Sequence, residues 1–78
     1  MPTVFRTGPY RFFFYAGDRD EPPHVHVERE NFEVKFWIDP VRLARSHGFS
    51  PNEINRIEAL IIEHEHKLQA SWNEFFNG

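Results

Sequence analysis

Residues 21–28 of the chain read EPPHVHVE, and this stretch decides the fold prediction. His24, His26 and Glu28 occupy alternate positions, with Val25 and Val27 between them. Because a β-strand sends successive side chains to opposite faces, the pattern predicts a strand. Its two valines would enter a core, and its two imidazoles and one carboxylate would share the other face. Such a strand can hold metal ligands or acid/base groups in fixed positions.

The next run, residues 32–38, alternates in the same way and predicts the second strand of a hairpin. Asn31 is the best turn residue between the two strands. A slip of one residue would turn every side chain over, so the valines must pair with the apolar side of the second strand. This register predicts one shared polar face, which consists of His24, His26, Glu28, Glu33, Lys35 and Trp37.

A first hairpin is predicted before these strands, from residues 3–6 and 10–15 around a turn at Thr7-Gly8-Pro9. Both of its strands are rich in β-formers, and residues 16–23 then read as a loop of Gly, Asp and Pro. The prediction for the N-terminal half is therefore a four-stranded antiparallel sheet made of two hairpins.

Two helices are predicted after the sheet. Asp39-Pro40 resembles a helix start, with Val41, Leu43 and Ala44 inward, Arg42 and Arg45 outward, and Gly48 as the stop. Residues 50–53 form a capping box for a long helix that reaches Phe76, about 39 Å away, with His64 inside its apolar stripe. The fold prediction is a single α+β domain over residues 1–78: the four-stranded sheet, a short helix and a long C-terminal helix packed on one face.

Composition restricts the classes of function. The 78 residues include nine Phe, two Trp and two Tyr, enough for a core without a disulfide or a structural metal. There is no cysteine and no apolar run long enough for a membrane span, so we expect a soluble cytoplasmic protein. The net charge of −3 arises entirely after residue 50, which disfavours general nucleic-acid binding but permits a basic patch in the N-terminal half.

The polar face supports a metal hypothesis. His24 and His26 can converge on one divalent transition metal, with Glu28 as the third ligand. An acid from the preceding loop (Asp18, Asp20 or Glu21) could take the place of Glu28. No third ligand is determined by the spacing, so a solvated or hydrogen-bonded polar face without any cofactor remains the simpler interpretation.

A second hypothesis for the same face is metal-free RNA cleavage. One imidazole would act as base and the other as acid, and Lys35 or Arg11 would stabilise the developing phosphorane charge. Trp37 could stack a base, and Arg42 and Arg45 form a small basic spot for phosphate. The candidate catalytic residues are thus His24, His26 and Lys35; the candidate binding residues are Arg11, Glu28, Glu33, Trp37, Arg42 and Arg45.

The chain also resembles a known family. The motifs that carry the likeness are PTVFR (2–6), YRFFFY (10–15), EPPHVHV (21–27), KFW (35–37), LAR with GFS (43–50) and WNEFF (72–76). They resemble the small bacterial family of domains of unknown function numbered 4160. The resemblance implies a bacterial protein, often encoded beside a second small gene in a toxin–antitoxin-like arrangement, but it supplies no agreed catalytic residues.

Taken with the resemblance, the expected function is one component of a toxin–antitoxin-like pair that acts through protein contact and possibly RNA. The expected partner is a small cognate protein or a second copy of the chain. The alternatives are a ribonuclease or metal-dependent hydrolase centred on His24 and His26, and a non-catalytic accessory binding module.

Overall fold

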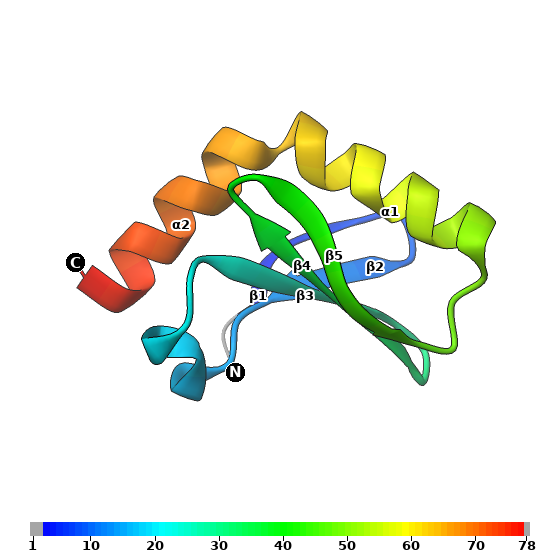
Figure 1. Cartoon of the computed structure of the whole chain (residues 1–78), viewed down its shortest axis with the longest axis horizontal. Helices are drawn as coiled ribbons and strands as arrows, with labels where there is room; N and C mark the ends of the chain where they lie inside the picture. Colours follow the sequence, from blue (N-terminus) through cyan, green and yellow to red (C-terminus); the bar gives the residue numbers. More distant parts are fainter. Residues whose placement is uncertain (1–2, 78) are drawn as a thin grey trace.

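The computed structural model describes residues 3–77 and contains a five-stranded antiparallel sheet followed by two α-helices (Figure 1). The sheet order follows the chain, and the connection between the second and third strands holds a short 3₁₀ helix. The elements are β1 (Thr3–Thr7), β2 (Tyr10–Phe13), η1 (Ala16–Asp20), β3 (His24–Arg29), β4 (Phe32–Ile38), β5 (Val41–His47), α1 (Pro51–Glu63) and α2 (Glu65–Asn77). The predicted α+β class, with an antiparallel sheet before two helices, is confirmed.

The prediction of a short helix after Asp39-Pro40 was wrong. These two residues form the turn of a third hairpin, with a cis peptide bond between them, and β5 pairs with β4 as a fifth strand. Val41, Arg42 and Leu43 also alternate between apolar and polar, so the local pattern fits a strand as well as a helix. Pairing with β5 satisfies backbone groups that β4 would otherwise expose along its edge, and this gain from the neighbouring strand favours the strand over the helix.

The long C-terminal helix was predicted correctly in position but not in continuity. It begins at Pro51, where the Ser50 hydroxyl accepts a hydrogen bond from the N–H of Glu53 at 3.2 Å, and it breaks at His64. The imidazole Nδ1 of His64 lies 2.8 Å from the carbonyl of Leu60, so a side chain competes for a helix-end carbonyl. The ring also packs on Phe5 of β1 at 4.7 Å, which ties the break to the sheet.

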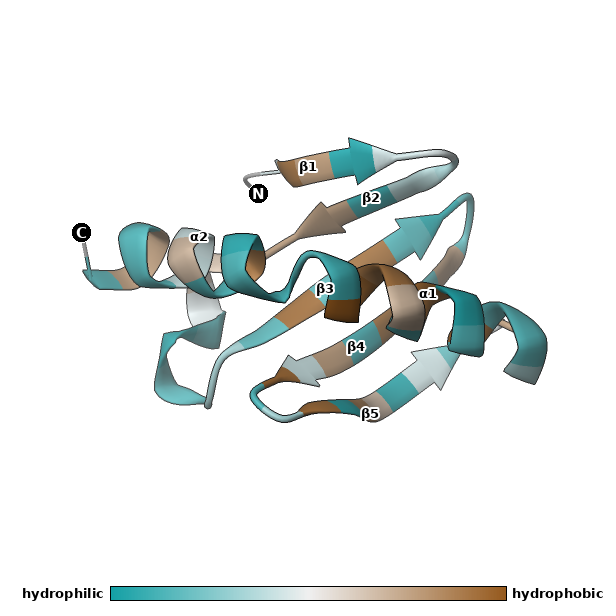
Figure 2. Ribbon diagram, turned by 90° about the horizontal axis from the view of Figure 1, so that it is seen from above, coloured by the Kyte–Doolittle hydropathy of each residue, from teal (hydrophilic) through white to brown (hydrophobic). Residues whose placement is uncertain are grey.

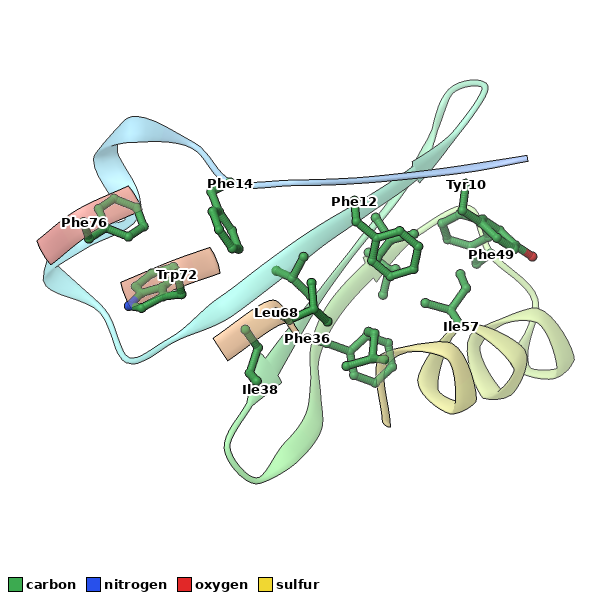
Figure 3. Close-up of a cluster of buried hydrophobic side chains, with 14 residues drawn as sticks. Tyr10, Phe12, Phe14, Phe36, Ile38, Phe49, Ile57, Leu68, Trp72 and Phe76 are labelled. Atoms are coloured by element: carbon green, nitrogen blue, oxygen red, sulfur yellow. The ribbon is translucent and has the colours of Figure 1, made fainter. Parts of the chain in front are cut away.

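Both helices lie over the same face of the sheet (Figures 1 and 2), and neither is long and apolar enough to cross a membrane. The core lies between them and the sheet (Figure 3). Its members from the sheet side are Tyr10, Phe12, Phe14, Val25, Val27, Val34, Phe36 and Ile38. Phe49 joins them from the connection between β5 and α1, and the members from the helices are Ile57, Ile61, Leu68, Trp72 and Phe76. The alternation in β3 and β4 therefore directs the valines inward, as the pattern predicted.

Gly48 is required where the chain turns from β5 towards α1. Its φ of +98° is disfavoured for other residues, and a Cβ atom there would lie 2.3 Å from Cδ1 of Phe32. We expect Gly48→Ala to lower the free energy of unfolding by about 2–4 kcal/mol, from backbone strain and overpacking. Urea unfolding measures this loss. The control is Gly17→Ala, where a Cβ meets nothing within 4 Å, and an equal loss in that variant would contradict the explanation.

Candidate metal centre

The predicted register between the two central strands is confirmed. The cross-strand pairs on the face opposite the helices are His24–Trp37, His26–Lys35 and Glu28–Glu33. All six side chains of the predicted polar face therefore lie on one side of the sheet, as strand alternation requires.

This face is covered where it carries the histidines. Between β2 and β3 the chain folds into η1, which places Asp18 against both imidazoles. His24 is 0% exposed and His26 is 2% exposed. The histidines therefore belong to a buried polar cluster, whereas the sequence suggested an open binding surface.

Three ligand atoms converge in this cluster. Oδ2 of Asp18 lies 3.1 Å from Nε2 of His24 and 3.0 Å from Nε2 of His26, and one ligand atom from each residue lies within 4.8 Å of the others. A metal with bonds of about 2.1 Å separates neighbouring ligands by about 3.0 Å at right angles and by about 3.4 Å in a tetrahedral site, so the two separations from Asp18 are close to those around one ion. Glu28 does not join them, because its carboxylate pairs with the guanidinium of Arg11 at 2.5 Å. The carboxylate of the centre comes from the preceding loop.

The outer nitrogen of each imidazole faces an oxygen atom. Nδ1 of His24 lies 2.9 Å from the carbonyl of Pro22 and donates to it, which leaves the Nε2 lone pair facing Asp18. Nδ1 of His26 lies 3.3 Å from Oε2 of Glu33. Histidines that bind metals usually donate their second N–H to a carbonyl or a carboxylate in this way.

Two of the four imidazole nitrogens of His24 and His26 have no hydrogen bond to the described residues. Nε2 of His24 and Nδ1 of His26 are both buried without a hydrogen-bond partner among residues 3–77. When the Nε2–H of His26 donates to Asp18, its Nδ1 lone pair faces the carboxylate of Glu33, which is unfavourable. A cation between the two Nε2 atoms would satisfy both nitrogens: it would bind Nε2 of His24 directly, and it would leave the proton of His26 on Nδ1, which could then donate to Glu33.

The protonation states favour ligation. Burial lowers the pKa of the His26 imidazole below its ordinary 6.5, although the Asp18 carboxylate partly opposes this. Burial alone would raise the pKa of the Asp18 carboxyl, but the Tyr15 N–H, at 2.9 Å, and the two imidazoles outweigh it and lower the pKa below 3.8. Neutral His26 and ionised Asp18 are the forms that bind a metal.

The lowered pKa of His26 predicts acid sensitivity. Because the pKa of His26 is lower in the folded than in the unfolded chain, the unfolded chain binds the proton more readily below about pH 6.5, and the free energy of unfolding falls as the pH falls. Urea unfolding of metal-free protein at pH 7.5 and 5.5 measures the loss. In His26→Gln the loss should be smaller; if it is equally large, another group is responsible.

Of the remaining candidate residues from the sequence, Lys35 and Trp37 lie beside the histidines, and Arg42 and Arg45 do not. Lys35, 8% exposed, pairs with Glu21 at 2.6 Å, and its ammonium lies 4.6 Å from the centroid of the Trp37 ring. The Trp37 ring in turn lies 5.5 Å from the His24 ring. Arg42 and Arg45 pair with Trp37 and Lys35 in the β4–β5 ladder and are exposed, without an ion pair in the described part of the chain. They lie two strands away from His24 and His26, at the edge of the sheet.

Sequence reasoning missed two aromatic neighbours of the centre. The Tyr15 N–H holds Asp18, and the Tyr15 hydroxyl donates to Glu33 at 3.2 Å, so one residue orients two of the carboxylates. Trp72 of α2 lies 5.1 Å from the His24 ring. Tyr15 lies just beyond the end of β2 and Trp72 lies in a helix, so strand periodicity could not reveal either.

Comparison with known proteins identifies the family. Searches of the curated proteins and of the solved structures find no match. The family model described as a domain of unknown function (DUF4160) matches residues 10–73, an interval that includes Asp18, His24 and His26. Because this match covers most of the chain, the protein belongs to the DUF4160 family of domains of unknown function.

Proposed function

We propose that the protein binds a divalent transition metal through Oδ2 of Asp18 and the Nε2 atoms of His24 and His26. The observation that carries the proposal is the buried Nε2 of His24, which has no hydrogen-bond partner within residues 3–77 and faces the carboxylate that His26 also contacts. Two imidazole nitrogens and one carboxylate oxygen suit Zn²⁺, Fe²⁺, Co²⁺ or Ni²⁺, whereas Mg²⁺ and Ca²⁺ prefer oxygen ligands throughout.

Metal binding fits this geometry better than either form of hydrolysis does. A metal-free ribonuclease needs its imidazoles in contact with the phosphate, and both rings are almost completely buried. A metal-dependent hydrolase needs a substrate at an open coordination position, and η1 would have to move aside to admit one. Bound metal would instead join η1 to β3 and so order the connection between β2 and β3.

The test is a cobalt titration of protein purified without a His-tag and dialysed against a chelator. Binding of one equivalent should produce visible Co²⁺ absorption bands. It should also quench tryptophan fluorescence, because Trp37 and Trp72 both pack on the His24 ring. Zn²⁺ should compete with Co²⁺ and raise the melting temperature. Absence of both spectroscopic changes at millimolar Co²⁺ would eliminate the proposal.

A second candidate function is membership of a toxin–antitoxin-like pair in the bacterial cytoplasm, as the family resemblance suggests. The observation in its favour is the exposed strand β5, which within residues 3–77 pairs on one side only and carries two arginines without an ion pair. Co-expression with the product of the adjacent gene should give a complex on size-exclusion chromatography, and expression of the toxin alone should arrest growth. Separate elution of the two proteins would argue against the pair.

A further inference from the structure

Strand β5 is an open edge of the sheet (Figure 2). It runs for seven residues and, in the described part of the chain, pairs only with β4. All its side chains are exposed except Val41 and Ala44, which are half-buried. An edge strand of this kind presents unpaired backbone N–H and C=O groups that can accept another strand.

The charged residues of this edge are all basic. From Val41 to Ser50 the chain has two arginines and one histidine but no acidic residue, although the protein carries a net charge of −3. Three basic groups on the inner strands are neutralised internally, in the pairs Arg11–Glu28, Arg29–Glu53 and Lys35–Glu21, whereas the opposite edge, β1, carries a single exposed arginine, Arg6. Arg42 and Arg45 have no such pair anywhere in residues 3–77, so their charge is available to a partner.

We propose that β5 accepts an extended acidic segment of a partner protein as a sixth strand. This inference rests on the pair described above and specifies its interface. Carboxylates on the partner would lie across from Arg42 and Arg45, which share the face of Trp37 and Lys35. The side chain of Leu43, 43% exposed, offers an apolar contact on the other face of the strand, where it pairs with Phe36.

A second copy of the chain fits this edge poorly. Antiparallel pairing of β5 with itself would bring the arginines of the two copies together, and like charges across a strand pair are destabilising. The ladder with β4 also has an irregularity near Ala44, since Lys35 pairs with Arg45 and Phe36 with Leu43. Such a bulge discourages long regular pairing, which favours a short partner segment.

The test uses two synthetic peptides of eight residues that alternate Val with Glu or Val with Lys. Amide spectra of isotope-labelled protein at low salt should show shifts and slowed exchange in β5 with the Glu peptide, while β1 stays unchanged. Arg45→Glu should weaken this binding about tenfold. The matched control is Arg6→Glu on β1, the opposite edge, which is also exposed and should change the affinity less than twofold.

Three results would overturn the inference: no binding of the Glu peptide at millimolar concentration, equal binding of the Lys peptide, or shifts confined to other elements. Whether the protein forms the toxin–antitoxin-like pair is tested separately, by co-expression with the adjacent gene product. If the adjacent gene product forms a complex that Arg45→Glu leaves intact, the pair stands and its interface lies elsewhere. If no complex forms while the Glu peptide still binds β5, the proposed partner is wrong but the edge remains a strand-binding site.

Discussion

Asp18→Asn is expected to lower the affinity for Co²⁺ by about a hundredfold or more. Ligand loss should exceed the loss of an outer-shell partner, which typically costs 10–100-fold. The amide removes the anionic charge at 3.0–3.1 Å from the two Nε2 atoms. It retains a carbonyl oxygen for the hydrogen bond from the Tyr15 N–H, so η1 should keep its position. The affinity is measured from the visible absorption of Co²⁺.

Companion variants separate ligands from their supports. His24→Gln and His26→Gln should lose affinity to the same degree as Asp18→Asn, whereas Glu33→Gln should cost about tenfold because it only orients His26. Glu28→Gln should have no effect on affinity, since that carboxylate pairs with Arg11 instead.

The matched control for Asp18→Asn is Asp20→Asn. Asp20 is an exposed carboxylate in the same 3₁₀ helix, so the change in charge is equal and only the position differs. A comparable loss of Co²⁺ affinity in both variants would mean that general electrostatic attraction, and not ligation by Asp18, explains the binding.

Phe36→Ala is expected to be the most damaging single change to the fold. Phe36 is 0% exposed in β4, and Figure 3 shows its ring in the cluster between the sheet and the helices. Truncation of a buried Phe costs about 3–5 kcal/mol, and a domain of this size has about 4–12 kcal/mol in total. Much of that stability would therefore be lost, and the melting temperature should fall steeply.

Far-ultraviolet circular dichroism during urea unfolding measures this loss. Phe75→Ala serves as the control, because Phe75 is 41% exposed on α2 and its removal leaves no enclosed cavity. We expect that control to lose less than about 1 kcal/mol. If the two variants unfold at the same urea concentration, Phe36 does not have the central packing role assigned to it.

Local sequence was sufficient to predict an element wherever one of its faces had to be buried or its own neighbours capped it. The hairpin of β3 and β4 was predicted with its register, because a slip by one residue would expose Val25 and Val27. The start of α1 was predicted as well, since Ser50 and Pro51 act through their own neighbours.

Local sequence failed where two structures had the same short-range signature. Asp39-Pro40 suits a helix start and a hairpin turn alike, and only the free edge of β4 selects the strand. The His64 ring at the helix break likewise packs on Phe5, which lies far away in the chain. Neither partner is visible in the pattern of the segment itself.

In the candidate metal centre, too, local sequence determined one part of the site and tertiary structure the other. Alternation in EPPHVHVE by itself determined that His24 and His26 share one face of a strand. The position of Asp18, the proposed third ligand, was determined only by tertiary structure. Its position depends on η1, which the Tyr15 N–H holds at one side and a hydrogen bond from Arg19 to the carbonyl of Phe76, 3.0 Å long, holds at the other. Contacts between such distant residues depend on how the whole chain packs, so the spacing of residues 21–28 could not show which carboxylate would complete the site.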